Sequence, residues 1–400
     1  MSEMSRFCLP RDIYHGKGCL EELKNLKGKK AILVVGGGSM KRQGFLDRAV
    51  GYLKEAGMEV QLFEGVEPDP SVETVMKGAE AMRAFEPDWI VSMGGGSPID
   101  AAKAMWAFYE YPDTTFEELC TPFNFPELRQ KAKFCAIPST SGTATEVTAF
   151  SVITNYQTGV KYPLADFNIT PDVAIVDPDL VAGLPVKQVA YTGMDALTHA
   201  IEAYIGRSTT KQTRAASIEA IQLIFDNLQT AYKNGNNKTA RRNMLRASYL
   251  AGTAFTKSYV GYVHAVAHSL GGCYGIPHGL ANSVLLPIVL EAYGTAAHKK
   301  LARLARITGI SDSKLDAVAA EEFINHIRSM NISMNIPETL DGIRNEDIPK
   351  LACYADKEAN PLYPVPALWG PEKLEQMYHL VQEVSEHDRN RNSEHPGKAA

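Results

Sequence analysis

Cysteine is scarce in this chain, and the cysteines it has are widely dispersed. The six occur without a single C-x-x-C pair, which removes the usual signature of a zinc ribbon, a redox motif or a disulfide framework. We therefore expect free thiols and a reducing, cytoplasmic compartment. No apolar run reaches the ~20 residues that cross a bilayer. The first ten residues lack a basic flank followed by an apolar core, so we expect no secretory signal.

Neither sign of charge predominates. The chain has 41 basic and 46 acidic side chains, for a formal net charge of -5, which gives no reason to expect nucleic acid or a membrane as partner. Apolar residues make up 45% and charged residues 22% of the sequence, as in an ordinary globular protein. Its 400 residues exceed what one hydrophobic core usually organises, so two domains are expected.

The two parts of the chain differ in their apolar patterns. Residues 1–185 alternate short β-branched runs with helical patterns, which predicts an α/β domain with a mainly parallel, Rossmann-like sheet. Residues 186–385 show helical spacing only, which predicts an all-helical domain. Residues 386–400 are polar without an apolar face, and we predict a disordered tail. The expected strands are 31–35, 60–63, 89–93, 134–137 and 173–176, and the expected helices are 45–56, 71–85, 192–205, 213–232, 240–256, 263–270, 280–293 and 316–327.

Two glycine runs directly follow predicted strands. They read V-V-G-G-G-S at 34–39 and V-S-M-G-G-G-S-P at 91–98. Glycines let a backbone approach a ligand closely, and the N-terminus of a following helix favours a pyrophosphate. In the second run we expect Ser97 to be the N-cap and Pro98 the first helical residue. A tight turn without a ligand is the alternative, and neither run is the G-x-G-x-x-G fingerprint.

A third turn, P-S-T-S-G-T-A-T-E at 138–146, also follows a predicted strand. Three such turns place a phosphorylated ligand along the carboxyl edge of the sheet.

The first glycine run also bears on the type of nucleotide. A ribose with two free hydroxyls is usually held by a carboxylate after the strand. Here glycines fill that place, followed by Ser39, Lys41 and Arg42. Small residues and cations suit a 2′-phosphate, which favours NADP(H). In the alternative interpretation Lys41 and Arg42 are simply solvated charges.

Asp195 and four histidines lie within residues 195–278. Asp195 and His199 are four residues apart, so they project from one face of a helix. A second segment supplies His264, His268 and His278. Three imidazoles and a carboxylate suit zinc or ferrous iron. The alternative is a helix-terminal aspartate with buried, hydrogen-bonded histidines.

Together these motifs identify a family resemblance. The segments G-G-G-S-P-I-D-A-A-K, S-T-S-G-T-A-T-E-V-T, G-M-D-A-L-T-H-A-I-E-A-Y and H-A-V-A-H-S-L-G-G-C-Y-G-I-P-H-G resemble the iron-containing (group III) alcohol dehydrogenase family, in order over about residues 7–385. The first glycine run resembles its NADP-using butanol dehydrogenase and aldehyde reductase branch. K-Y-P-L-A-D is instead similar to the alcohol dehydrogenase half of bifunctional enzymes. The usual S-G-T-G-S-E is S-G-T-A-T-E here.

The resemblance implies a metal-dependent enzyme that transfers a hydride between NAD(P)(H) and a small primary alcohol or aldehyde. It also implies a site in the cleft between the two domains, Fe²⁺ or Zn²⁺ as the metal, and a homodimer. A dehydroquinate synthase-like lyase and a non-catalytic nucleotide-binding protein are the alternatives. The implied residues are Asp195, His199, His264 and His278 for the metal; His268 and Phe150 beside the substrate; and Gly37, Gly38, Ser39, Lys41, Gly95, Gly96, Ser97, Asp100, Thr140, Thr143, Lys161 and Leu180 for the cofactor.

Overall fold

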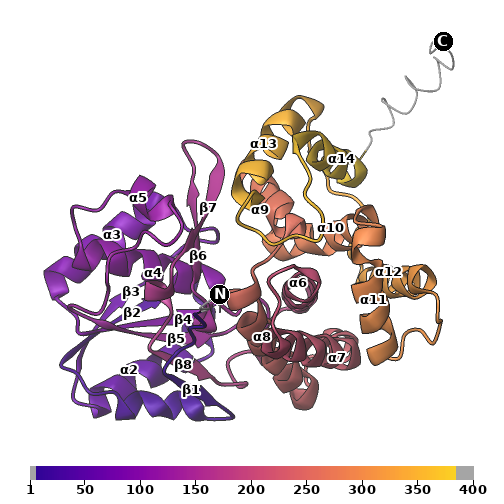
Figure 1. Cartoon of the computed structure of the whole chain (residues 1–400). Coiled ribbons are helices and arrows are strands. Elements are labelled where there is room, and N and C mark those ends of the chain that lie inside the picture. Colours follow the sequence, from indigo (N-terminus) through magenta and orange to yellow (C-terminus); the bar gives the residue numbers. More distant parts are fainter. Residues whose placement is uncertain (1–5, 384–400) are drawn as a thin grey trace.

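A six-stranded parallel sheet organises the first part of the chain in the computed structural model, which describes residues 6–383 (Figure 1). The strand order is β1-β8-β5-β4-β2-β3, and every neighbouring pair is parallel. The parallel α/β sheet predicted from the sequence is therefore confirmed. The strands are β1 (Asp12–His15), β2 (Lys30–Val35), β3 (Glu59–Phe63), β4 (Trp89–Gly94), β5 (Lys133–Pro138) and β8 (Val173–Val176), with a separate antiparallel hairpin of β6 (Phe150–Asn155) and β7 (Val160–Ala165).

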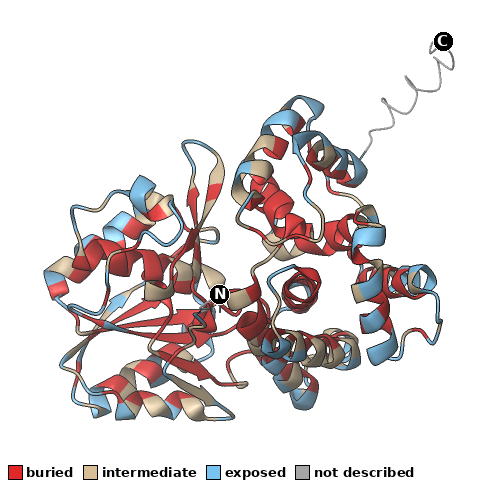
Figure 2. Cartoon of the chain, viewed as in Figure 1, coloured by how far each residue is buried: buried red, intermediate tan, exposed pale blue. Residues whose placement is uncertain are grey.

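Helices cover both faces of this sheet. Alternate residues of one strand point to opposite faces, and in β2 both sets are buried: Leu33 belongs to one apolar cluster, Ile32 and Val34 to the other. Figure 2 shows the buried strands between helices whose outer surfaces are exposed. The helices of this part are α1 (Ser39–Arg42), α2 (Phe45–Glu55), α3 (Val72–Phe85), α4 (Gly96–Glu110) and α5 (Phe116–Cys120), with 3-10 turns η1 (Cys19–Asn25), η2 (Thr145–Val147) and η3 (Phe167–Ile169).

The order of the strands reverses beside β2. From β2 the chain adds β3 on one side and then β4 on the other. Ligands of such sheets bind beyond the carboxyl ends of the strands at this switch point. The loops that leave β2 and β4 there are the two glycine runs, at 36–38 and 94–96. The topology therefore brings together two motifs that lie about 60 residues apart.

The remainder of the described chain is helical, as predicted. Helix α6 is central to it, because nearly all of its second half is buried and it contacts α7, α8, α10 and α11. Strands end at Val176 and α6 begins at Val186, while residues 386–400 lie outside the described part. The helices are α6 (Val186–Ile205), α7 (Lys211–Lys233), α8 (Lys238–Ser258), α9 (Tyr262–Tyr274), α10 (His278–Ala292), α11 (Thr295–Ile307), α12 (Asp316–Ser333), α13 (Ile348–Ala359) and α14 (Pro371–Val381), with the 3-10 turn η4 (Asn345–Asp347).

Several elements carry no clear signal in the sequence. Strand β1 has only four residues, and β7 contains Pro163, which a central strand would not tolerate. The hairpin tolerates it because β7 pairs only with β6. The expected cap of α4 is wrong: the N-cap is Gly95 rather than Ser97, and Pro98 is the third helical residue. The extended backbone of Gly95 starts the helix directly after β4, and Pro98 still lies where an N–H has no helical partner.

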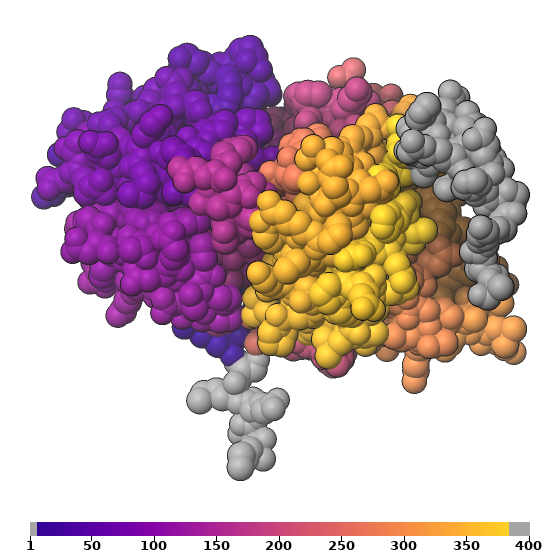
Figure 3. Space-filling view, turned by 90° about the horizontal axis from the view of Figure 1, so that it is seen from above, coloured from indigo at the N-terminus to yellow at the C-terminus, as the bar shows by residue number. Residues whose placement is uncertain are grey.

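The two parts of the molecule abut along a seam (Figure 3). A small apolar cluster spans it, with Val147 and Val176 on one side and Leu245 and Phe255 on the other.

Among residues 6–383, no single helix is long and apolar enough to span a bilayer; α10 and α11 reach that length and composition only together, and a bend of 116° separates them.

Candidate functional site

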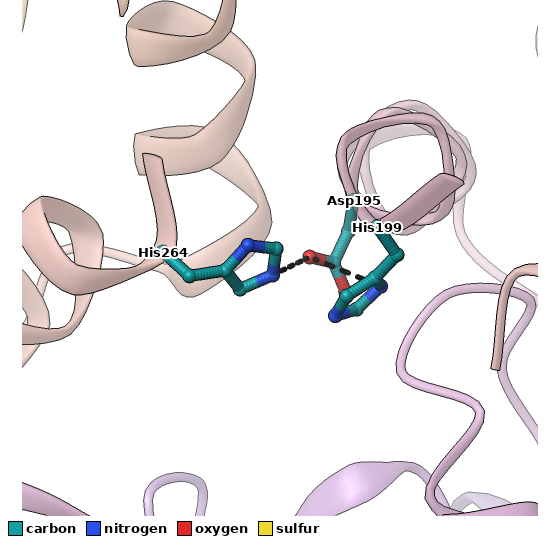
Figure 4. A group of neighbouring side chains, drawn as sticks. All are labelled: Asp195, His199 and His264. Atoms are coloured by element: carbon teal, nitrogen blue, oxygen red, sulfur yellow. Dashed lines mark ion pairs between the residues drawn. The ribbon is translucent and has the colours of Figure 1, made fainter. Parts of the chain in front are cut away.

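Three helices bring the aspartate and the histidines together. Asp195 and His199 project from the same face of α6, His264 comes from α9, and His278 is the first residue of α10. Figure 4 shows the first two side chains pointing at His264 across the gap between their helices. Asp195, His199 and His264 offer ligand atoms within 4.8 Å of one another, and all three are buried. Such a donor set is suited to a divalent transition metal.

His278 lies beside this group. Its Nε2 is 3.5 Å from Oδ1 of Asp195, compared with 3.7 Å for Nε2 of His264 and 4.0 Å for Nδ1 of His199. The amide of Asn282 donates to the same oxygen of Asp195 at 2.8 Å. One carboxylate oxygen therefore has all three predicted imidazoles around it.

The electrostatics of the group favour a cation. Burial lowers the pKa of His199 to about 3 and also lowers that of His278, so these two rings are neutral. Burial opposes ionisation of Asp195, but the neighbouring histidines hold its pKa well below the usual range. An ionised carboxylate beside neutral imidazoles is the protonation state in which these residues bind a metal.

Glu202 supports His264 from behind. Its carboxylate accepts a hydrogen bond from Nδ1 of His264 at 2.6 Å and others from the backbone N–H groups of Gly261 and Val263 at 2.9 Å. It thus caps the N-terminus of α9 and holds the imidazole so that Nε2 faces Asp195. Such carboxylate–histidine contacts fix the orientation of metal ligands. Burial opposes a positive His264, but its bonds to Asp195 and Glu202 raise its pKa to about 9. Without metal this ring therefore carries a second proton at neutral pH, and a metal bound at Nε2 would displace it.

The Glu202→Gln substitution is therefore expected to weaken metal binding about 10- to 100-fold. The amide has nearly the same shape, but it has no negative charge with which to hold the imidazole. Competition with a fluorescent chelator measures the metal affinity, and Glu127→Gln, at an exposed glutamate, is the matched control. Equal affinities in both variants would contradict a supporting role for Glu202.

The N-terminus of α4 forms the second half of the site. Its N-cap, Gly95, has no side chain to occupy the free N–H groups of the first turn. A Cβ on Gly96 would lie 2.9 Å from the side chain of Thr143, so the third turn packs directly on this one. The buried hydroxyl of Thr140 has no hydrogen-bond partner among the described residues. Free amides and an unpaired hydroxyl fit a pyrophosphate.

A cavity of about 190 Å³ joins the two halves. Its lining draws on both sides of the seam and includes many of the residues predicted from the sequence. They are Gly96, Ser97, Asp100, Thr143, Phe150, Lys161, Asp195, His199, His264, His268 and His278.

The other predicted cofactor residues lie outside this cavity. Gly37, Gly38, Ser39 and Lys41 follow the neighbouring strand β2, and the Lys41 ammonium is 3.2 Å from the Glu64 carboxylate. Gly95 and Thr140 lie close together, because a Cβ added to Gly95 would be 3.1 Å from the Thr140 side chain. The side chain of Leu180 is buried in the core between the sheet and α2.

Two predicted residues at the cavity form contacts within the protein. Lys161 is buried, and its ammonium is 2.6 Å from Asp69, in the loop before α3. The carboxylate of Asp100 accepts hydrogen bonds from the hydroxyl of Thr145 and the backbone N–H of Val152. Asp100 therefore ties the first turn of α4 to the hairpin.

Lys103 and Glu146 are buried at the third turn, residues 138–146. The ammonium of Lys103 donates to the carbonyl oxygens of Thr145, Thr148 and Phe150 at 2.7–2.8 Å. It thereby holds the third turn and the start of β6 against α4. Neither carboxylate oxygen of Glu146 has a hydrogen-bond partner among the described residues, and burial raises its pKa from 4.5 to about 7.

The raised pKa of Glu146 predicts a loss of stability with rising pH. A carboxyl group whose pKa is higher in the folded state holds its proton more tightly there, so the folded state loses stability as pH rises from 4.5 to about 7. Glu146→Gln removes this ionisation and is expected to raise the free energy of unfolding by about 1–3 kcal/mol at pH 8, with a smaller effect at pH 5. Thermal denaturation at both pH values measures the effect. An equal change at both would contradict it.

Sequence analysis missed four residues around the site. Glu202 had a signal, because it follows Asp195 and His199 at helical spacing, and Lys103 ends the motif G-G-G-S-P-I-D-A-A-K. Asn282 had the same kind of signal, because it lies one turn after His278 in α10. Glu358 had none, because it reaches the site from α13, 90 residues beyond His268.

Comparison with known proteins matches both parts of the chain to one family. A family model described as "Iron-containing alcohol dehydrogenase" matches residues 10–178, and one described as "Fe-containing alcohol dehydrogenase family, C-terminal" matches residues 189–380. The chain is 57% identical to an NADPH-dependent butanol dehydrogenase of Clostridium saccharobutylicum, over 84% of this chain and 86% of the relative. It is 41% identical to a 1,3-propanediol dehydrogenase of Klebsiella pneumoniae, over 85% and 88% of the two chains. A crystal structure of a 1,3-propanediol oxidoreductase superposes with a TM-score of 0.87 and 36% identity, over 94% and 99%.

Proposed function

The chain belongs to the iron-containing alcohol dehydrogenase family, and from this we propose that it is a metal-dependent alcohol dehydrogenase or aldehyde reductase. It transfers a hydride between NADP(H) and a small primary alcohol or aldehyde. The observation that carries the proposal is the shared cavity: the metal-ligand group and the N-terminus of α4 open into the same space of about 190 Å³. A substrate bound there lies against both.

The proposed metal ligands are Asp195, His199, His264 and His278. Three of them form a buried group, and Nε2 of the fourth is 3.5 Å from the shared carboxylate oxygen. When bound, Fe²⁺ or Zn²⁺ would polarise the oxygen of the substrate as a Lewis acid, and the nicotinamide would exchange the hydride.

The other proposed roles follow from position. The free N–H groups at Gly96 and Ser97 hold the pyrophosphate, with the hydroxyls of Thr140 and Thr143 beside it. Phe150 and His268 line the cavity, and we assign them to the nicotinamide and substrate. Phe150 lies against Phe255 and Tyr259, with ring centroids 5.9 Å apart, so its ring forms an apolar wall that keeps water from the reacting carbon.

The residues after β2 support NADP(H) over NAD(H). Gly37 leaves space where a ribose-binding carboxylate would stand, because a Cβ there would have no atom within 4 Å, and Lys41 is exposed nearby. The sequence relative named above as NADPH-dependent agrees with this assignment. We assign Leu180 to the wall of the cofactor site on the family resemblance, and its side chain is buried.

The lyase alternative is disfavoured by the charges at the cavity. A phosphorylated substrate needs free cations, but Lys161 is the only lysine or arginine in the cavity lining among residues 6–383, and it is paired with Asp69. A non-catalytic nucleotide-binding protein would have no use for the buried metal-ligand group.

We further propose a cytoplasmic homodimer. All six cysteines are free thiols, which supports a reducing compartment. The dimer is supported by the family resemblance, and light scattering behind a size-exclusion column tests it.

The initial rate of NADPH oxidation with butanal tests the proposed function. The protein is reloaded anaerobically with Fe²⁺ or with Zn²⁺, or is treated with a chelator. We expect metal-dependent turnover that is faster with NADPH than with NADH. Turnover that survives complete removal of metal would contradict the role of the metal, and no oxidation with either metal across several aldehydes would overturn the enzyme class.

A further inference from the structure

His268 occupies a fixed place in the wall of the reaction cavity. It lies one helical turn after His264 in α9. Its ring stacks on that of His278, with centroids 5.0 Å apart and planes inclined by 19°. Its Nδ1 contacts a carboxylate on α13, whereas its Nε2 has no hydrogen-bond partner among residues 6–383. The free nitrogen of this ring is therefore the one available to a substrate.

The carboxylate partner of His268 belongs to Glu358. Its Oε1 lies 2.8 Å from Nδ1 of His268 and 2.8 Å from the hydroxyl of Tyr363, and all three side chains are largely buried. Burial and the neighbouring Glu358 hold the pKa of Tyr363 well above its usual value, so Tyr363 keeps its proton and donates a hydrogen bond to Oε1. The carboxylate oxygen is thus an acceptor, and the contact with His268 requires a proton on Nδ1.

We propose that Glu358 is a positioning residue that fixes His268 as the Nδ1–H tautomer and so presents the bare Nε2 as a hydrogen-bond acceptor for the hydroxyl of the alcohol substrate. The inference rests on the proposed function, which it deepens. A neutral imidazole has one donor and one acceptor nitrogen, and the partner of one decides the role of the other. An accepting Nε2 thus orients the hydroxyl of a bound alcohol.

The geometry gives this contact a role beyond packing. Glu358 reaches the site from a helix that contributes none of the proposed metal ligands, and it also lines a second cavity of about 480 Å³ between α13 and the hairpin. Its carboxylate is the only hydrogen-bond partner of the His268 ring among the described residues. Without it, the ring is free to place its proton on Nε2, where it would no longer accept a hydrogen bond from an alcohol.

Nitrogen NMR tests the tautomer directly and independently of turnover. The zinc-loaded protein is labelled with ¹⁵N-histidine, and long-range ¹H–¹⁵N correlations distinguish the protonated from the bare ring nitrogen. His268→Gln identifies the signals of His268. We expect a neutral Nδ1–H ring in the wild type, in Glu358→Gln, which retains an acceptor oxygen, and in Tyr363→Phe. In Glu358→Leu we expect that pattern to be lost. An Nε2–H ring in the wild type overturns the proposal.

Kinetics then test the consequence. We expect Glu358→Leu to lower kcat for alcohol oxidation about 10- to 100-fold, with unchanged KM for NADP⁺ and unchanged zinc content, and Glu358→Gln to recover most of the rate. Glu372→Leu, at an exposed glutamate of α14, is the control. A loss of zinc or of cofactor binding in parallel with kcat, or equal loss in the Leu and Gln variants, overturns the positioning role. An inactive wild type with the expected tautomer would instead contradict the proposed function alone.

Discussion

His264→Ala is expected to abolish metal retention and turnover together. The substitution removes an imidazole whose Nε2 lies 3.7 Å from Asp195, in the centre of the ligand group. It also leaves the buried Glu202 without the partner it holds at 2.6 Å. Loss of Lewis-acid catalysis raises the activation free energy by several kcal/mol, so we expect the rate to fall by at least about 10³-fold.

The measurement pairs elemental analysis after dialysis with the initial rate of NADPH oxidation. His379→Ala removes an exposed histidine of α14 and controls for the loss of an imidazole as such. Circular dichroism confirms that the variant is folded, since an unpaired buried carboxylate is destabilising. A variant with a full complement of metal would contradict the ligand role of His264, and one with a normal rate and no metal would contradict the metal mechanism.

Gly37→Asp is expected to reverse the choice of nucleotide. A Cβ at Gly37 would have no atom within 4 Å, so an aspartate fits without displacing its neighbours. Its carboxylate would accept hydrogen bonds from the two hydroxyls of an NADH ribose and repel a 2′-phosphate. The repulsion between the carboxylate and the 2′-phosphate costs several kcal/mol of binding free energy. We therefore expect kcat/KM for NADPH to fall about 10²- to 10³-fold, with little or no loss for NADH.

Gly37→Asn separates charge from size in this experiment. The amide has the same shape as the carboxylate but does not repel a phosphate, so most of the NADPH activity should remain. Lys41 contributes in either case, because its pair with Glu64 at 3.2 Å is exposed and easily exchanged for a phosphate. If the Asn and Asp variants lose NADPH activity equally, steric hindrance rather than charge is responsible.

Much of the site could be predicted because its signals are local. Asp195 and His199 lie on one face of α6 because they are four residues apart, and Glu202 continues that face at the next turn. The glycine runs identified where strands give way to helices, and a parallel sheet necessarily brings those ends to one edge. The start of α4 was predicted wrongly. Gly95, whose backbone is extended, is the N-cap, so the helix begins before Ser97.

Tertiary structure decided which distant residues complete the site. Strand β7 has no clear signal in the sequence, because Pro163 argues against a central strand, but pairing only with β6 makes the proline harmless there. Glu358 meets His268 only because α13 packs against α9.

Periodicity and turn chemistry act over a few residues, so sequence alone specified the parallel sheet, the helical second part, the glycine turns and the spacing of Asp195 and His199. The partners of buried polar groups are set by how whole helices pack. The roles of Glu358, Asn282 and Lys103 therefore emerged only in the folded chain, where each buried donor or acceptor must find a partner that water no longer supplies.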